Sequence, residues 1–240
     1  MEKMQTLTPD EFHSLVHAAK AVLAHDSFHG SARVIFDQAK RLTGATAGYI
    51  ALLSDSGMEN EVLFLDDGGL PCSVDPNLPM PIRGLRALAY RQCRTVVENA
   101  FPASEHAPFL PPGHVPLRNV MFAPLIVEGK VRGVMGLANK ASDFIGHDIE
   151  LASALGEFAA IALHNSRTLD KLRTTVAELN RAIGEIRKLQ GIIPICMHCK
   201  KIRDEEGYWH MVEEYIMEHS EAVFSHGLCA ECMAKHYPES

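Results

Sequence analysis

Four cysteines near the C-terminus are the residues best suited to chemistry. They form two Cys-x-x-Cys pairs, Cys196/Cys199 and Cys229/Cys232, in a sequence of 240 residues with six cysteines. Four thiolates in paired knuckles are a ligand set with which Zn²⁺ forms tetrahedral structural sites. A segment of about fifty residues buries too little apolar surface to fold unaided. The pattern therefore predicts a structural zinc site, made of Cys196, Cys199, Cys229 and Cys232, that holds a small module over residues 194–240.

Other uses of paired cysteines fit the sequence less well. A dithiol redox pair is expected near a βαβ pattern, and neither pair has one. Covalent c-type haem needs a histidine after the second cysteine, where this sequence has Lys200 and Met233. An iron–sulfur cluster accepts the same four thiolates, so it stays an alternative to zinc.

Composition sets the class of the protein. The net charge is −7, and 47% of the residues are hydrophobic, which is enough for one good-sized core and a small appendage. This acidic balance gives no basic footprint for nucleic acid. No stretch approaches the roughly 20 apolar residues that span a bilayer, and the first residues lack the pattern of a secretory signal. We expect a cytoplasmic protein that binds neither nucleic acid nor membrane.

The first predicted element of the chain is a helix within residues 1–30. Thr8 is suited to cap it, with Pro9 at its first position and Glu11 closing a capping box. Helical spacing predicts an apolar face that packs on the core. That face contains Phe12, Leu15, Val16, Ala19, Val22 and Leu23.

The middle of the chain alternates helices with strands. Helix signals cover residues 31–42, ending at Gly44, and residues 83–93. Strand signals cover residues 47–53, 61–69 and 95–99, and a hairpin is predicted around Glu128–Lys130. Residues 101–116 hold five prolines and form a long loop of the kind that covers sites. The predicted class is α+β, with an antiparallel sheet and flanking helices.

Residues 31–166 resemble a GAF domain, a sensory module with a central antiparallel sheet. The segments APLIVEGKVRGVMGLANK and FIGHDIELASALGEFAAIALHNS carry the resemblance. Part of the signature of cyclic-nucleotide GAF domains is also matched, by Asn139, Lys140, Phe144 and Asp148. The chain departs from this signature at its last acidic position, where it has Ile149. A Lys140–Asp148 salt bridge between the sheet and the last helix is the structural alternative to nucleotide contact.

The resemblance implies a pocket between the sheet and the helix and loop that cover it, within residues 83–119. Candidate ligand-binding residues there are Cys93, His114, Arg118 and Asn119. Each is also compatible with an ordinary loop or core position. Some GAF sensors bind haem through Cys or His, and haem would implicate Cys93 and His114.

A heptad pattern follows the predicted domain. Leu169, Val176 and Ile183 occupy a positions, and Leu172, Leu179 and Ile186 occupy d positions. Branched residues at a with leucine at d favour a parallel two-stranded coiled coil. We expect residues 167–193 to form a coiled-coil linker and the protein to be a homodimer. The alternative is an amphipathic helix that folds back on its own domain.

Residues 189–238 resemble a short C-terminal module of bacterial two-component signalling proteins. The motifs LQGIIPICMHCKKIRDEEGYW and FSHGLCAEC carry this resemblance. It implies a histidine kinase or a response regulator as the partner.

Together these patterns predict a non-enzymatic sensor. A GAF domain would bind a small molecule and pass its state through a dimeric coiled coil to a zinc-stabilised interaction module. One enzyme alternative is methionine sulfoxide reduction, which a GAF-fold family performs with active-site cysteines. Cys72 and Cys93 are the thiols available for it in the predicted domain. A haem-based redox or gas sensor is the other alternative.

Overall fold

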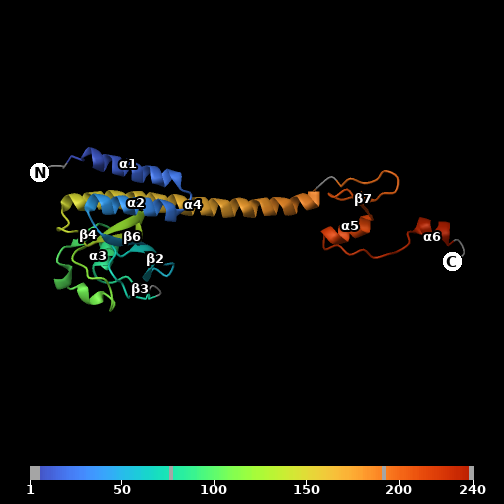
Figure 1. The fold of residues 1–240 in the computed structure, drawn as a ribbon. Coiled ribbons are helices and arrows are strands. Elements are labelled where there is room, and N and C mark those ends of the chain that lie inside the picture. The colour runs from blue at the N-terminus through green and yellow to red at the C-terminus, as the bar shows by residue number, and fades with distance from the viewer. Residues whose placement is uncertain (1–5, 76–77, 191–192, 238–240) are drawn as a thin grey trace. The chain divides into compact units, whose positions relative to one another are not determined.

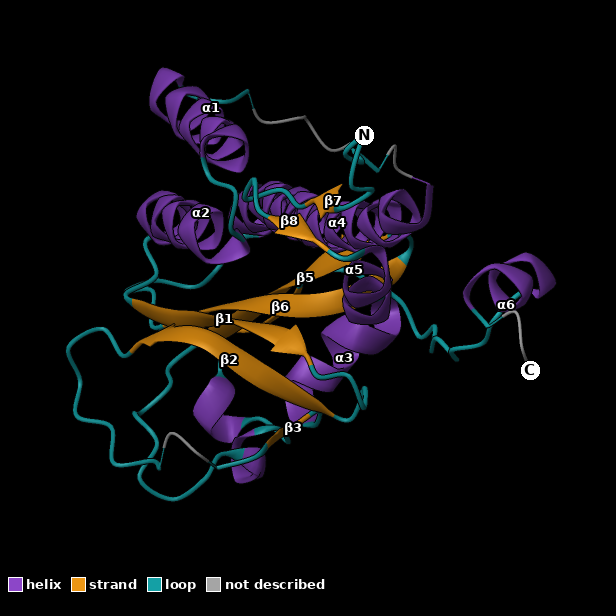
Figure 2. Ribbon diagram, turned by 90° about the vertical axis from the view of Figure 1, so that its right-hand side faces the viewer, coloured by secondary structure: helices purple, strands orange, loops and turns teal. Residues whose placement is uncertain are grey.

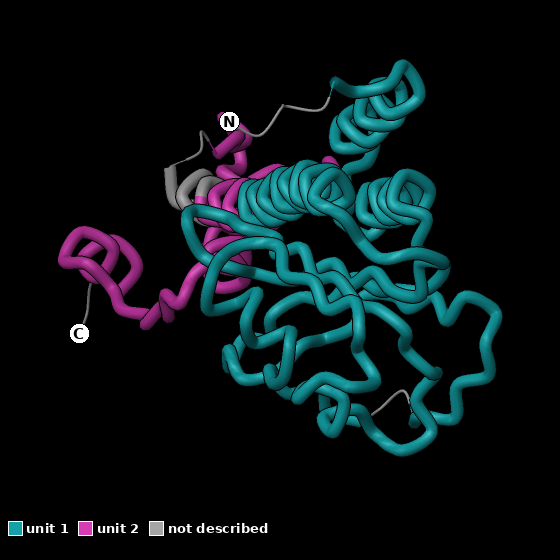
Figure 3. The backbone as a smooth tube through the Cα atoms, turned by 90° about the vertical axis from the view of Figure 1, so that its left-hand side faces the viewer, with its two compact units in different colours: residues 1–172 teal, residues 173–240 magenta. Residues whose placement is uncertain are grey.

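The computed structural model describes residues 6–75, 78–190 and 193–237. The chain divides into two compact units, residues 1–172 and residues 173–240 (Figure 3). The order of the elements along the chain can be followed in Figure 1. Over the described residues, no helix is both long enough and apolar enough to cross a membrane.

A six-stranded sheet forms the centre of the first unit. Its order is β3-β2-β1-β6-β5-β4, and each neighbouring pair is antiparallel. The strands are β1 (Ala47–Leu53), β2 (Glu59–Asp66), β3 (Met80–Pro81), β4 (Val96–Glu98), β5 (Val120–Val127) and β6 (Lys130–Ala138). This confirms the predicted α+β class with an antiparallel sheet. The second strand ends three residues earlier than predicted, because the chain turns at Gly68 and Gly69 with positive φ.

Three helices cover one face of this sheet, α1 (Pro9–Ala24), α2 (Phe28–Thr43) and the first part of α4 (Gly146–Gln190). Figure 2 shows α2 and α4 against the sheet and α1 outside them. Ile35 and Phe36 of α2 and Leu155 of α4 are fully buried with Met121 and Met135 of the sheet. Strand residues alternate between faces, so the neighbours of Met121 and Met135 point to the opposite side.

Helix α1 begins as predicted, and Val22 and Leu15 of its predicted apolar face pack in the core, but the rest of the buried face differs. Thr8 and Glu11 form the capping box. The buried residues, however, are Ser14, Ala18, Ala21 and Val22. Of the predicted apolar face, Phe12 is 57% exposed and Leu23 is 86% exposed, so those two assignments were wrong. The physical reason is close packing: small residues let α1 approach α2, and the large residues turn outward.

The other face of the sheet is covered by α3 (Gly84–Gln92) and by two segments without regular strands, one within residues 67–75 and 78–79 and one over residues 99–119. The second segment carries short 3₁₀ turns, η1 (Phe101–Ala103) and η2 (Ala107–Phe109). Leu85, Ala89, Val96, Phe101 and Phe122 form a smaller core on this side.

Hairpin β5–β6 has the turn that its sequence predicts. Glu128 and Gly129 have φ of 51° and 73°, so both lie in the left-handed region. Two such residues in a two-residue loop match the twist of antiparallel strands.

Helix α4 continues to Gln190, well beyond the sheet. Leu151, Leu155 and Ala162 are buried in the first unit. Leu169, Leu172, Val176 and Leu179 are all exposed in the single chain, and Leu172 reaches 57%. The side chains of Ile183 and Ile186 lie outside the described residues. The predicted a and d positions that are described therefore lack a partner within the chain, and the coiled coil stays a prediction.

Beyond the end of α4, the described part of the second unit contains short elements. These are β7 (Ile202–Arg203), β8 (Trp209–His210), α5 (Val212–His219) and α6 (Ala230–His236). Strands β7 and β8 pair in an antiparallel hairpin. His210 Nε2 lies 2.6 Å from Asp204 Oδ2 and ties the hairpin to its own turn.

Candidate functional site

A cavity of about 850 Å³ lies in the first unit, on the face of the sheet that α3 covers. Its walls come from β1, β2, β5 and β6, from the start of α3, and from the two irregular segments. Cavities of about 300–1,000 Å³ are typical of sites for small molecules. The predicted pocket region, residues 83–119, covers only part of this wall, since residues within 65–75 and 78–81 form another part of it.

The floor of the cavity is aromatic. Tyr49 of β1 and Phe122 of β5 both pair with Gly136 of β6, which lies between them. Their rings lie 6.1 Å apart. A Cβ at position 136 would lie 2.9 Å from Phe122 Cε1 and 3.0 Å from Tyr49 Cε1. Glycine at this position therefore allows both rings to pack over β6.

Arg86 brings a positive charge to the cavity wall. Its Nη1 donates to the Tyr49 hydroxyl at 2.9 Å, and its Nη2 donates to the Pro81 carbonyl at 2.6 Å. Its Nε is buried and has no hydrogen-bond partner. Across the described residues, no carboxylate lies within ion-pair distance of Arg86. This guanidinium is thus held by neutral groups and keeps one unused donor.

The environment of Tyr49 favours the protonated form of its phenol. Burial raises the pKa of its phenol, and the neighbouring Arg86 charge opposes that rise only in part. The Tyr49 oxygen accepts a hydrogen bond from Arg86, so its own O–H remains available as a donor.

Histidine and cysteine side chains also line the cavity. They are His106, His114 and Cys72. Nδ1 of His114 lies 2.9 Å from the Val115 carbonyl oxygen. A carbonyl can only accept, so Nδ1 carries a proton, and in the neutral ring Nε2 would have the free lone pair.

The four residues predicted to bind a ligand are not brought together. His114 lines the cavity. Cys93 is exposed at the C-cap of α3, with φ of 50°, and is not among the lining residues. Arg118 is exposed, and its backbone N–H donates to Asn139. Tyr49, Arg86 and His106 line the cavity and were not among the predicted ligand-binding residues.

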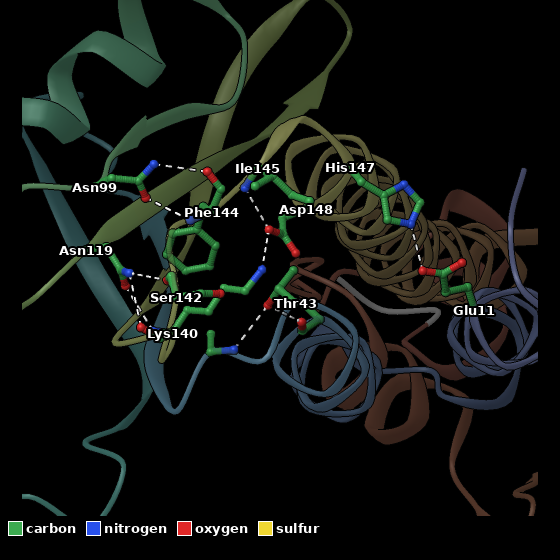
Figure 4. A network of polar contacts seen from close by, with 12 residues as sticks. Glu11, Thr43, Asn99, Asn119, Lys140, Ser142, Phe144, Ile145, His147 and Asp148 are labelled. Atoms are coloured by element: carbon green, nitrogen blue, oxygen red, sulfur yellow. Dashed lines mark hydrogen bonds and ion pairs between the residues drawn. The ribbon is translucent and has the colours of Figure 1, made fainter. Parts of the chain in front are cut away.

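Asn119 has a structural environment. It is fully buried, and its Nδ2 donates to the Lys140 and Ser142 carbonyls at 3.1 and 2.7 Å. Its Oδ1 accepts from the Lys140 N–H at 2.9 Å. Figure 4 shows these bonds, which fix the segment after β6.

The same segment ties the sheet to α4. Lys140 forms an ion pair with Asp148, the interaction predicted as the structural alternative to nucleotide contact. Asp148 Oδ2 also accepts from the Ile145 N–H at 2.8 Å, at the start of α4. Nearby, His147 Nε2 lies 2.7 Å from Glu11 Oε1 and connects α4 to α1 (Figure 4).

In the second unit, the first cysteine pair has the local geometry of a metal knuckle. The Cys199 N–H donates to Cys196 Sγ at 3.5 Å, and Lys200 has φ of 64°. The Cys199 N–H and neighbouring backbone N–H groups lower the pKa of the Cys196 thiol. This arrangement favours the thiolate, which is the form that binds metal.

The second pair lies at the start of a helix. Cys229 is the N-cap of α6, and Cys232 is in its first turn. Backbone N–H groups, that of Cys232 first, lower the pKa of the Cys229 thiol. Within residues 6–75, 78–190 and 193–237, no three potential ligands lie close enough together to hold a metal ion. Each pair has suitable donors, and the joint site stays a prediction.

Comparison with known proteins agrees with this architecture. A family model described as GAF domain matches residues 25–164, more than half of the chain. The GAF domain of an Acinetobacter phosphoenolpyruvate-protein phosphotransferase is 19% identical, with a TM-score of 0.56; the match covers 66% of this chain and 95% of that one. Free methionine-R-sulfoxide reductase from Neisseria meningitidis is 16% identical, with a TM-score of 0.55, over 70% of this chain and 99% of that one. At these identities the likeness concerns the fold.

One curated relative is named as a sensor. The methyl sulfide methyltransferase-associated sensor of Methanosarcina acetivorans is 26% identical over 169 residues, which is 64% of this chain. The match spans 16% of that relative's length.

Proposed function

Since the chain belongs to the GAF domain family, we propose that it is a non-enzymatic sensor whose cavity binds a small molecule. The state of the cavity would pass through α4 to the C-terminal cysteine module. The cavity is the observation that carries this proposal. It combines an aromatic floor, an arginine with an unused donor, and walls made of two irregular segments. Irregular segments are the parts of a domain that most readily change on binding.

The sheet offers a short path from the cavity to α4. Phe122 faces the cavity, whereas its neighbours Met121 and Ala123 pack in the core that contains α4. Gly156 lets α4 approach β5 closely, since a Cβ there would lie 3.2 Å from the Pro124 carbonyl oxygen. A ligand that moves β5 would therefore act directly on α4. It can shift the helix only by its difference in affinity for the two states.

A homodimer fits the outer part of α4. Leu169, Leu172, Val176 and Leu179 are large, apolar and exposed at heptad spacing. A second copy of the helix would cover them in a coiled coil. The chain would then act as a cytoplasmic homodimer, with a histidine kinase or a response regulator as its downstream partner.

Structural zinc is the proposed metal of the second unit. Cys196, Cys199, Cys229 and Cys232 would hold it, and bound Zn²⁺ would supply the cross-link that so small a unit needs. The fit rests on two local features, the knuckle at Cys196 and the helix start at Cys229. An iron–sulfur cluster would use the same donors.

The two alternatives for the cavity differ in what they require. Methionine sulfoxide reduction needs two cooperating thiols, and only Cys72 of the predicted pair lines the cavity. Haem needs an axial ligand, which His114 would offer through Nε2, whereas Cys93 is remote from the lining. A visible absorption spectrum of the purified protein separates haem from a colourless ligand.

The experiment that tests the sensor proposal measures distance across the dimer. A spin-labelled residue at Thr175, an exposed position of α4, reports the separation of the two helices. We expect a ligand that raises the melting temperature of the first unit also to change the distance distribution at Thr175. An unchanged distribution at saturating ligand would refute the relay.

A further inference from the structure

We propose that the cavity is selective for a small organic monocarboxylate with an apolar body, whose carboxylate binds Arg86 and Tyr49. This inference rests on the proposed function, because it names the chemical class of the ligand of the same cavity.

The first argument is the uncompensated charge of Arg86. Arginine carries its charge at every physiological pH, and a cation removed from water is stabilised by an anion. Here its described partners are a phenol and a backbone carbonyl, both neutral. By contrast, Lys40 and Lys140, which are also partly buried, each have a carboxylate partner in Asp66 and Asp148. Arg86 is therefore a partly buried cation whose pairing a bound anion would complete.

The second argument is the set of donors. Nε of Arg86 is buried and unpaired, and the Tyr49 O–H is free to donate because its oxygen accepts from Arg86. A carboxylate has two oxygens that only accept. One oxygen can take a hydrogen bond from the guanidinium and the other from the phenol. The planar guanidinium matches a carboxylate better than a point charge would.

The third argument limits the ligand to one negative charge. Asp67 and Asp75 also line the cavity, beside Asp66, which pairs with Lys40, so a second anionic group would meet carboxylates of like charge. Arg83 is the other arginine of the lining, and it is exposed over the Phe109 ring at 5.9 Å. This balance disfavours phosphates and nucleotides.

The fourth argument concerns the body of the ligand. Beside Tyr49, the lining holds Leu85, Phe101 and Phe122, which offer apolar and aromatic surface. The cavity volume of about 850 Å³ accommodates an aromatic ring or a medium aliphatic chain. A carboxylate anchored at Arg86 would place such a body over this floor.

The test compares acids with their uncharged amides. The neutral dye N-phenyl-1-naphthylamine reports occupation of the apolar cavity by its fluorescence. Competitors are 4-phenylbutanoate, indole-3-acetate and octanoate, each beside its primary amide, with phenyl phosphate as the dianion. The variants are Arg86→Gln and Tyr49→Phe. Arg91→Gln is the matched control, because Arg91 lies on the same helix, is exposed and is not part of the lining.

We expect at least one acid to bind with an affinity about 10- to 100-fold higher than that of its amide, as measured by displacement of the dye. This is the range for a hydrogen bond to a charged group. Arg86→Gln should abolish that ratio, Tyr49→Phe should reduce it, and Arg91→Gln should preserve it. An unchanged far-UV circular dichroism spectrum shows that a variant is folded.

Three results would overturn the inference while leaving the sensor proposal in place. They are equal displacement by acids and amides, tighter binding of phenyl phosphate, and an acid preference that survives in Arg86→Gln and Tyr49→Phe. A different result would refute the proposed function itself: dye and competitors fail to bind the wild type, or bind equally well when Val62→Trp, at the cavity wall, narrows the space.

Discussion

Replacing Asn119 with alanine tests whether this residue holds the fold or contacts a ligand. Its side chain makes three hydrogen bonds, to the Lys140 N–H, the Lys140 carbonyl and the Ser142 carbonyl. Alanine removes all three hydrogen bonds, so the backbone groups of Lys140 and Ser142 lose their hydrogen-bond partner. We therefore expect Asn119→Ala to destabilise the first unit.

The size of the effect follows from the number of bonds. Each hydrogen bond contributes about 1 kcal/mol net, so the loss is about 3 kcal/mol, and it approaches about 5 kcal/mol if the freed groups stay dry. For a protein of this size, 1 kcal/mol lowers the melting temperature by about 2–4 °C. The expected drop is thus roughly 6–12 °C.

The assay must separate the two units. The chain has one tryptophan, Trp209, which belongs to the second unit. Its fluorescence therefore reports that unit, whereas most of the described helix and all strands except β7 and β8 lie in the first. Far-UV circular dichroism should show the lowered transition, and the Trp209 transition should stay where it is.

Arg118→Ala provides the matched control. Arg118 is the adjacent residue, is exposed, and takes part in the described hydrogen bonds through its backbone. We expect its stability to change by less than about 0.5 kcal/mol. If Asn119→Ala is as stable as Arg118→Ala, the three bonds do not support the fold and the structural assignment of Asn119 fails.

The remaining predictions concern charge, metal and assembly. The Thr8 backbone N–H, and then His147, lower the pKa of Glu11 from 4.5 to about 2. A lowered pKa stabilises the fold above pH 4.5, and this stabilisation is lost as pH falls toward 2, so Glu11→Gln should flatten acid unfolding in that window. Cys196→Ser should abolish the binding of about one zinc per chain, measured by elemental analysis. Leu172→Glu should convert the dimer to monomer in sedimentation analysis.

Each of these has a control in the same chain. Glu150 has a side chain that is 69% exposed, and its carboxylate lies 3.8 Å from His147 Nδ1. Glu150→Gln should therefore leave acid unfolding unchanged. Cys93→Ser removes an exposed thiol outside the pairs and should keep the zinc. A variant at exposed Asn180, replaced by glutamate, should stay dimeric, because it lies beside the a and d positions. Each prediction is contradicted if the variant and its control give the same result. The results compared are acid unfolding for Glu11, zinc content for Cys196 and molecular mass for Leu172.

Local signals predicted the local structure well. The Thr8 capping box, the Gly44 C-cap and the Glu128–Gly129 turn all depend on residues within a few positions of one another. Such signals act before any tertiary contact forms. They predicted the positions of most helices and strands of the first unit. Those elements confirm the predicted α+β class.

The cavity depended on contacts that no local pattern contains. Arg86 lies among four arginines in residues 83–94, and nothing in that stretch distinguishes it from the other three. Its environment comes from Tyr49, 37 residues away, and from the segment before α3. The one available hint was position, since Arg86 shares a helix face with Ala89 and Tyr90, three and four residues later.

The error in α1 explains why apolar periodicity could not choose the buried face. The helix has two candidate faces. One is lined by the small residues Ser14, Ala18 and Ala21, and the other presents Phe12 and Leu23. The face with the small residues packs against α2, because small residues let the two helices approach closely. Close approach makes more contacts than large side chains would make with the helices further apart. The large residues then remain exposed, as do Leu169, Leu172, Val176 and Leu179 of α4. A second copy of the chain, already proposed from the heptads of α4, would give both apolar faces a partner, so Phe12→Glu should weaken the same dimer as Leu172→Glu.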